Sequence, residues 1–170
     1  YDTQDLLDFD ERIKKFLKDS SEQKIEYFCE PKFDGLALEI IYEKGLFIKA
    51  ITRGDGQTGE DVSHNIKTIK GLPLRLLTSD PPELLEVRGE VLIFKKDFED
   101  LNRDQQENGA SVFANPRNAA AGTVRQLDSS IAADRPLRFI GYTLGDFRGV
   151  EFETQASISS YLQEVGIPSS

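Results

Sequence analysis

The sequence has few residues of the kinds that build disulfide and metal sites. It contains one cysteine, Cys29, and one histidine, His64, and it has no methionine or tryptophan. A single cysteine excludes a disulfide within the chain, and one cysteine with one histidine cannot form a four-ligand structural zinc site. No apolar run is long enough to span a membrane, and no secretory leader is recognisable. We therefore expect a cytoplasmic globular protein.

The sequence also has fewer basic than acidic residues. The chain has 21 Lys and Arg against 30 Asp and Glu, which gives a net charge of -9. This balance argues against a self-sufficient nucleic-acid binder, because neutralising phosphates requires a clustered basic surface. Any such contact must be local, and the candidates for a small positive site are Arg53, Arg88, Arg117 and Arg125. The 170 residues suffice for one domain with a core, and the start at Tyr1 indicates a fragment.

Hydrophobic periodicity predicts a mixed fold, an antiparallel meander of strands with flanking helices. Strands are expected over residues 25–29, 36–42, 46–52, 85–94 and 137–143, with a tight turn at 43–45 and a short linking strand between Pro73 and Pro81. Helices are expected over residues 6–17, 60–69, 95–108, 116–128 and 155–165, with a loop over 19–23. We expect the first helix to pack through its apolar face, Cys29 to be a buried strand residue, and His64 to lie on an outer helix face.

The stretch with the strongest indication of chemistry is Glu30-Pro31-Lys32-Phe33-Asp34-Gly35, between the first two predicted strands. Gly35 has no side chain and would let the backbone approach a ligand. A lysine amine becomes a good nucleophile where desolvation or neighbouring positive charge lowers its pKa. We interpret Lys32 as a covalent nucleophile. The pattern is short enough to arise by chance, so a surface turn with a solvated lysine is the alternative.

Two further stretches have charged side chains directly beside a glycine and are candidates for ligand contacts. Arg53 ends a predicted strand and opens the glycine-rich run 54–59, where its planar fork of donors could hold a phosphate. The alternative is a loop whose glycines serve geometry alone. Arg88 and Glu90 share one face of the predicted strand 85–94 on either side of Gly89, and they either face a ligand or form an edge-strand ion pair.

Residues 113–128 form the second informative stretch. Asn115 is expected to cap a helix that has Pro116 at its first position and small residues suited to close packing. Arg117 in the first turn opposes the helix dipole, and an anion shared with the free N–H groups would explain it. Arg125, eight residues later, falls within about a quarter turn of the same face. Two exposed, solvated arginines are the alternative.

With these stretches together, the chain resembles the adenylation (nucleotidyltransferase) domain of bacterial NAD-dependent DNA ligases over essentially its whole length. The resemblance rests on the motifs at residues 30–37, 52–56, 87–91 and 113–122. It implies an α+β covalent nucleotidyltransferase fold, similar to that of DNA ligases and mRNA capping enzymes, with antiparallel sheets flanked by helices. It also implies that residues 1–170 are a fragment of the domain, without the upstream nicotinamide-binding segment and the downstream end.

By this resemblance Lys32 attacks the α-phosphorus of NAD and carries AMP, which passes to the 5′-phosphate of a DNA nick before the 3′-hydroxyl seals it. Asp34 is implied as a second catalytic residue that helps to place the metal or the DNA 3′ end. The implied cofactor-binding residues are Glu30 at the adenine, Glu90 at the ribose, and Lys32 and Arg53 at the phosphates. The implied contacts with phosphate or nicked DNA are Arg117 and Arg125.

The resemblance further implies a DNA replication and repair enzyme that acts as a monomer on nicked double-stranded DNA with NAD in the bacterial cytoplasm. Mg²⁺ or Mn²⁺ is expected at the reacting phosphate. Zn²⁺ is expected only in a C-terminal part outside this chain, and no set of metal ligands is expected within the chain itself. The isolated fragment is not expected to seal nicks. The alternatives are an ATP-dependent polynucleotide ligase and a nucleotide- or DNA-binding module without catalysis.

Overall fold

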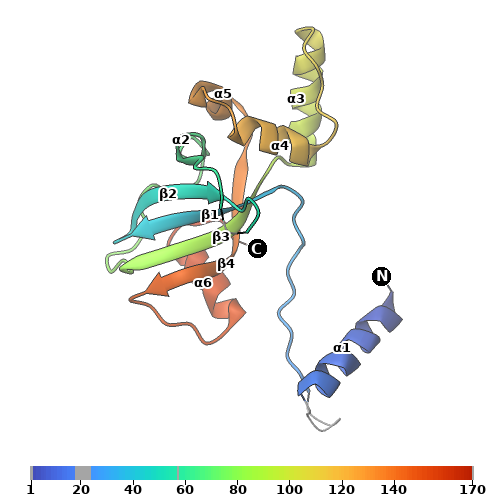
Figure 1. Ribbon diagram of the computed structural model, residues 1–170, viewed down its shortest axis with the longest axis vertical. Coiled ribbons are helices and arrows are strands. Elements are labelled where there is room, and N and C mark those ends of the chain that lie inside the picture. Colours follow the sequence, from blue (N-terminus) through green and yellow to red (C-terminus); the bar gives the residue numbers. More distant parts are fainter. Residues whose placement is uncertain (1, 18–23, 57, 170) are drawn as a thin grey trace.

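The computed structural model describes residues 2–17, 24–56 and 58–169, and an antiparallel sheet lies at its centre (Figure 1). Within these residues the sheet has four strands, β1 (Leu36–Glu43), β2 (Leu46–Thr52), β3 (Leu84–Leu92) and β4 (Arg138–Arg148). Their order is β2-β1-β3-β4, and every neighbouring pair is antiparallel. The predicted α+β class is confirmed, and the loop expected over 19–23 lies outside the described residues.

The turn between β1 and β2 follows the sequence signal closely. Lys44 and Gly45 both have positive φ, at 48° and 75°, as a two-residue hairpin turn of the favoured twist requires. A side chain on Gly45 would lie 2.7 Å from Pro81, so glycine is also required for space. The turn thereby joins the hairpin to the segment that leads into β3.

One face of the sheet forms the core. Side chains alternate along β1, so that Leu38, Ile40 and Tyr42 are buried while their neighbours face the other side. The buried Tyr42 hydroxyl donates to the carbonyl of Pro73 at 2.8 Å. The largest fully buried side chains are Tyr42, Phe139, Ile40, Ile66, Leu85, Leu137, Leu162 and Ile167. The opposite face carries the polar side chains of β1 and β3 and stays open.

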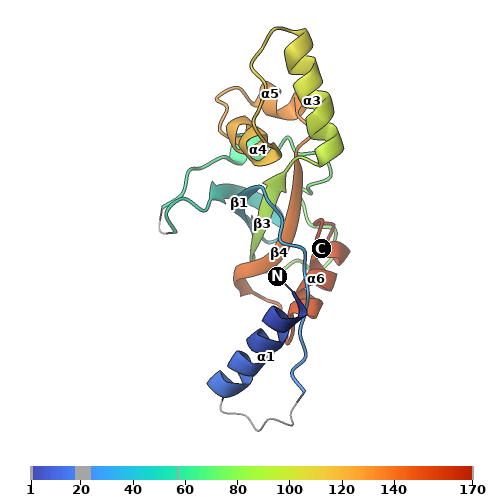
Figure 2. The same cartoon turned by 90° about the vertical axis from the view of Figure 1, so that its right-hand side faces the viewer.

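The helices are arranged around the core face and one end of the sheet (Figures 1 and 2). The short α2 (Ser63–Ile66) packs against β2, α4 (Pro116–Val124) against β1 and β3, and α6 (Gln155–Glu164) against β4. Two more helices follow β3 and α4 in the chain, α3 (Lys95–Glu107), which projects from the domain, and α5 (Ser129–Asp134), which was not predicted from the sequence. No helix in the described ranges combines the length and apolar character needed to span a bilayer.

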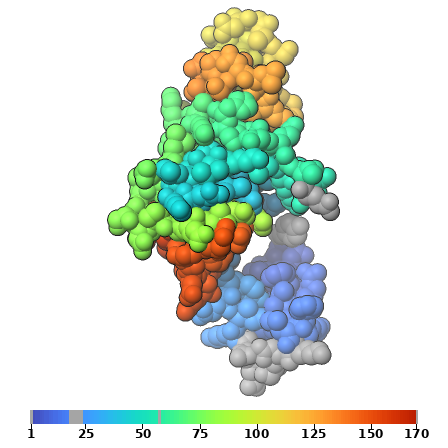
Figure 3. Space-filling view, turned by 60° about the vertical axis from the view of Figure 1, so that its left-hand side comes forward, coloured from blue at the N-terminus to red at the C-terminus, as the bar shows by residue number. Residues whose placement is uncertain are grey.

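The N-terminal helix α1 (Thr3–Leu17) lies apart from the sheet (Figure 3). The prediction that it packs against the core is wrong, because none of its residues is buried and Phe16 is 84% exposed. It contacts the extended segment 24–34 instead. The Tyr27 hydroxyl donates to Asp10 at 2.8 Å, and the ring of Tyr27 lies 5.9 Å from that of Phe9.

The strand predicted over residues 25–29 is also wrong. These residues lie in the extended segment between α1 and β1, where no adjacent strand satisfies their backbone (Figure 1). Favourable β propensity does not make a strand without a hydrogen-bonding neighbour, since the sheet is a tertiary structure. Cys29 is consequently exposed, against the prediction that it is buried.

Two other boundaries differ from the prediction. The helix expected over 60–69 is reduced to α2, because residues 60–62 run beside β2, with Thr52 N–H donating to Glu60 and Val62 N–H to Ala50. The predicted inward positions of Val62, Ile66 and Ile69 are nevertheless confirmed. The linking strand expected between residues 73 and 81 is reduced, in the described chain, to one isolated bridge from Arg75 to β2.

The core assignment predicts a large contrast between two isoleucines. Ile40 on β1 is fully buried, whereas Ile48 on β2 is 47% exposed. Truncation of a buried isoleucine leaves a cavity, so we expect Ile40→Ala to lower the free energy of unfolding by about 2–5 kcal/mol. The matched change Ile48→Ala should cost less than about 1 kcal/mol. Urea titration of the 170-residue chain measures both, and equal losses would contradict the assigned core face.

Candidate nucleotide-binding and catalytic site

The open face of the sheet contains a cavity of about 520 Å³. Residues of all four strands line it, and one wall is formed by the glycine-rich loop that follows β2. Its lining includes Ala37, Glu39, Arg53, Thr58, Arg88 and Tyr142. This size lies within the range of small-molecule sites, about 300–1,000 Å³.

Residues 30–35, the Lys32 segment, are attached to the sheet beside this cavity through Gly35. The Gly35 N–H donates to Glu90 Oε1 at 3.1 Å, which links the start of β1 to β3. A Cβ at position 35 would lie only 2.2 Å from the Val91 carbonyl oxygen. No other residue can occupy this position without moving the strand, so glycine sets how closely the Lys32 segment approaches β3.

Glu90 is the partly buried acid of the site. Burial raises the pKa of the Glu90 carboxyl, while the hydrogen bond from Gly35 and the positive charges of Arg117 and Lys32 act in the opposite direction. These influences place Lys32, Arg117 and Glu90 within one electrostatic neighbourhood. Lys32 itself is exposed, as is Glu30, which lies on the extended segment outside the lining of the cavity.

The first turn of α4 approaches the same segment. Asn115 caps the helix as predicted, its side chain accepting from the Asn118 N–H at 2.7 Å. Arg117 donates from Nη1 to Asp34 Oδ1 at 3.3 Å, and both side chains are more than half exposed. Arg117 thus pairs with the carboxylate of Asp34, and the predicted anion shared with the N–H groups of the first turn stays a prediction.

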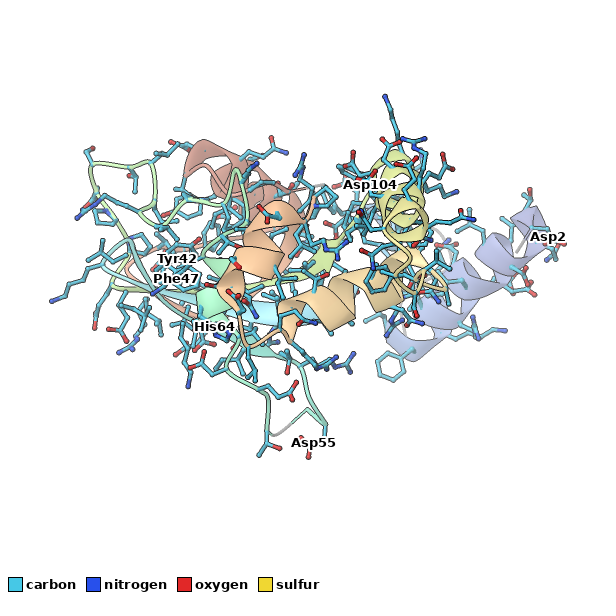
Figure 4. The ribbon with its side chains drawn as sticks, turned by 90° about the horizontal axis from the view of Figure 1, so that it is seen from above. Asp2, Tyr42, Phe47, Asp55, His64 and Asp104 are labelled. Atoms are coloured by element: carbon cyan, nitrogen blue, oxygen red, sulfur yellow. The ribbon has the colours of Figure 1, made fainter. Side chains whose placement is uncertain are left out.

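The glycine-rich loop places Arg53 at the wall of the cavity. Its backbone N–H donates to the Ala37 carbonyl at 3.1 Å, and Asp55 Oδ1 accepts from the Thr58 N–H at 2.8 Å (Figure 4). A side chain at Gly54 or Gly59 would meet a backbone carbonyl oxygen within 2 Å. The two glycines therefore permit the tight fold of the loop, and the loop in turn carries Arg53 to the cavity.

Arg125 lies on the other side of this loop. It lines a second cavity of about 520 Å³, which shares Thr52, Thr58 and Gly59 with the first, and its Nε donates to Glu60 Oε2 at 2.7 Å. The expected common helix face for Arg117 and Arg125 is not formed, because α4 ends at Val124 and Arg125 is its C-cap. Eight residues of helix correspond to about 12 Å, so the two arginines mark opposite ends of α4.

Two features of the cavity were not identified from the sequence. The register of β3 and β4 shifts between Arg88 and Gly89, whose partners are Thr143 and Gly141. The shift leaves Tyr142 as the extra residue of a bulge, from which it lines the cavity. Glu90 raises the pKa of Tyr142 in addition to the larger effect of burial, which places the two side chains near each other. Strict alternation along a strand would not have predicted this.

Arg88 is held across the sheet rather than beside Glu90. Its Nε donates to Glu39 Oε2 on β1 at 2.7 Å, and Glu39 raises the pKa of the guanidinium. The alternative of an edge-strand ion pair between Arg88 and Glu90 is therefore wrong, because Arg88 pairs with Glu39 and β3 is a central strand between β1 and β4. Both partners line the cavity. In the part of the chain that the structure describes, no three His, Cys, Asp or Glu side chains converge as metal ligands would.

The environment of Glu90 predicts a pH-dependent effect on stability. Because burial raises its pKa, the folded state retains the proton to a higher pH than the unfolded chain, and stability is lost as the pH rises through the folded-state pKa. Glu90→Gln keeps an acceptor for Gly35 without the charge. We expect the melting temperature of Glu90→Gln relative to wild type to rise from about pH 4 towards neutral pH and then level off.

Thermal melts of the 170-residue chain followed by circular dichroism measure this difference. Glu107→Gln, at the exposed end of α3, serves as the matched control and should show no such trend. A deficit in the Glu90 variant that is equal at every pH would show that the carboxylate is not disfavoured by its surroundings.

Comparison with known proteins assigns this arrangement to a family. Residues 1–170 match the family described as NAD-dependent DNA ligase adenylation domain. The chain is 62% identical over 168 residues to a DNA ligase of Bdellovibrio bacteriovorus, and 51% identical over 164 residues to one of Geobacter sulfurreducens. These matches cover 99% and 96% of this chain. A DNA ligase of Pseudomonas aeruginosa is 48% identical over 176 residues. The chain spans about a quarter of the length of these curated relatives, and it belongs to the NAD-dependent DNA ligase adenylation domain family.

Proposed function

We propose that the chain is the part of an NAD-dependent DNA ligase in which Lys32 becomes covalently attached to AMP. The observation that carries this proposal is the attachment of the Lys32 segment to β3 through Gly35 and Glu90. Together with the Arg117–Asp34 ion pair, that hydrogen bond groups a lysine, an arginine and two acids next to Ala37, which pairs with Glu90 and lines an open cavity of nucleotide size. Family membership supports the same chemistry, and NAD is the nucleotide that the family description names.

In the proposed first step, the neutral Nζ of Lys32 attacks the α-phosphorus of NAD. A phosphorus–nitrogen bond forms, the phosphorus–oxygen bond to nicotinamide mononucleotide breaks, and the ammonium proton of the product is lost to solvent. The enzyme then transfers AMP to the 5′-phosphate of a nick, which breaks the phosphorus–nitrogen bond. The 3′-hydroxyl finally displaces AMP, so that one phosphodiester forms at the expense of one dinucleotide.

The cavity provides suitable contacts for the adenylate. Arg53 reaches it from the glycine-rich loop and is the side chain that we assign to phosphate. Glu90 can accept hydrogen bonds from ribose hydroxyls while it holds Gly35, since a carboxylate has several acceptor positions. Tyr142 offers an aromatic surface for the base. Glu30 is the residue that we assign to the adenine edge, which it would reach if the extended segment closed over the cavity.

The two arginines of α4 suit a strand of DNA. Each strand of a duplex presents one phosphate per about 3.4 Å of helix axis, so two arginines about 12 Å apart along α4 can contact different phosphates of one strand. Arg117 and Arg125 are each paired with an acid, Asp34 and Glu60, in exposed ion pairs. Such pairs contribute about 0–1 kcal/mol, so exchanging the carboxylate for a DNA phosphate costs little.

Asp34 is also the carboxylate that we assign to a metal ion. Mg²⁺ is commonly bound through one or two carboxylates together with substrate phosphates, and Asp34 is exposed and two residues from Lys32. A bound ion would neutralise charge on the reacting phosphate. Asp34 can serve it only after releasing Arg117, which is then available for phosphate.

The assignment of Lys32 predicts which lysine carries AMP. In the full-length protein, Lys32→Ala and Lys32→Arg should both abolish the AMP adduct formed with NAD, because a guanidinium stays protonated and cannot attack. Lys70→Ala, on an exposed lysine after α2, should form the adduct as wild type does. Intact-mass spectrometry after incubation with NAD, and separately with ATP, measures the adduct and tests the ATP-dependent alternative. Recovery of AMP on another lysine in either Lys32 variant would show that the assignment is wrong.

A further inference from the structure

A buried asparagine holds the backbone on both sides of Arg125. Asn65 lies on α2 and is fully buried. Its Nδ2 donates to the carbonyl of Val124 at 2.7 Å and to the carbonyl of Gln126 at 2.7 Å. These are the residues immediately before and after Arg125, so one side chain from a distant part of the sequence fixes both flanking peptide groups.

Two additional contacts make the same turn rigid. His64 lies on α2 beside the α4–α5 connection (Figure 4), and its Nε2 is 3.1 Å from the Gln126 carbonyl oxygen. Because a carbonyl only accepts, the ring nitrogen must be the donor. The Gln126 side chain donates in turn to the carbonyl of Gly122 at 3.0 Å. The backbone that carries Arg125 is therefore held from α2 as well as from its own helix.

Asparagine is an unfavourable residue at this core position. Within the described residues its Oδ1 is buried without a hydrogen-bond partner. Burial of an unpaired polar atom is unfavourable, and an apolar side chain such as leucine, which has the same branching, would avoid it. Its neighbours in the chain and across the contact, Ile66 and Val124, are fully buried apolar residues. The amide is therefore explained at this position by the two hydrogen bonds that its Nδ2 donates to the backbone.

The geometry points to Asn65 as a positioning residue for Arg125, an inference that rests on the proposed function. By fixing the peptide groups of Val124 and Gln126, Asn65 holds the Arg125 side chain beside the glycine-rich loop, where Arg125 and Gly59 line one cavity. Arginine has many rotamers, and its planar fork recognises phosphate only from a defined direction. A fixed backbone keeps that direction when Glu60 is exchanged for the phosphate of nicked DNA.

A double-mutant cycle in the full-length ligase tests this inference. The variants are Asn65→Leu, Arg125→Ala and the combination, assayed for single-turnover sealing of a nick that already carries AMP on its 5′-phosphate. We expect Asn65→Leu to slow sealing by up to about 100-fold, the order of loss expected from misplacement by about 1 Å. If Asn65 acts through Arg125, the combined variant should be no slower than Arg125→Ala alone.

The control is Asn108→Ala, which removes an exposed asparagine whose Nδ2 likewise donates to a helical carbonyl, that of Asp104, at the end of α3. It should seal at the wild-type rate. If the rate losses of Asn65→Leu and Arg125→Ala multiply in the combined variant, the inference is overturned, because independent losses indicate a general structural effect. A wild-type rate for Asn65→Leu would overturn it as well. Full activity of Arg125→Ala would instead refute the proposed role of Arg125 itself.

A second cycle covers the case in which Asn65→Leu does not fold. His64 is exposed, and His64→Ala removes the other α2 contact to Gln126 without disturbing the core. A smaller loss of sealing that disappears in the Arg125→Ala background supports the positioning role. No loss, or a loss that persists in that background, would overturn it.

Discussion

The hydrogen bond from the Gly35 N–H to Glu90, with the close approach of Gly35 to the Val91 carbonyl, fixes the site. The extended segment before β1 has no regular structure, so its end at Gly35 is the place where Lys32 gains a defined position relative to the sheet. Glu90, to which we assign the ribose contact, therefore also anchors the segment that carries the proposed nucleophile, Lys32. This double role explains why a partly buried acid persists here although burial disfavours its charge.

The rest of the site follows from how the sheet divides its two faces. The core face is closed by α2, α4 and α6, which leaves the polar face of β1, β3 and β4 for ligand. Regular alternation alone would place one side chain opposite Arg88, but the bulge adds Tyr142 to the wall of the cavity. On the other side, the glycine-rich loop separates the Arg53 cavity from the Arg125 cavity. The two adjoining cavities thus share the end of β2 and the loop that follows it, and the C-cap residue of α4 lines the second.

Local signals predicted the parts of this fold that depend on neighbouring residues. The hairpin turn at Lys44, the cap at Asn115 and the strand β1 were all predicted from the sequence. The segment 25–29 has the composition of a strand and is not one, because a strand exists only beside a partner that the local sequence does not specify. The contacts of Asn65 with residues some 60 positions away were invisible for the same reason. The residues alone suggested a nucleophile at Lys32 and a phosphate contact at Arg53, whereas the ribose contact of Glu90 came from the resemblance.

The acidic charge of the chain is compatible with the proposed contact with DNA, provided that this contact orients the domain on the DNA and contributes little to the affinity. A net charge of -9 repels the phosphates, and each arginine of α4 already has a carboxylate partner. Two phosphate contacts would give a dependence of log K on log salt of only about -1.8, which is weak for a DNA-binding surface. Contacts with phosphate nevertheless define the register of a protein on the duplex. A domain that supplies two positioned arginines and little affinity would leave the strength of binding to other parts of the ligase, and it could release Asp34 and Glu60 only where a nick is held in place.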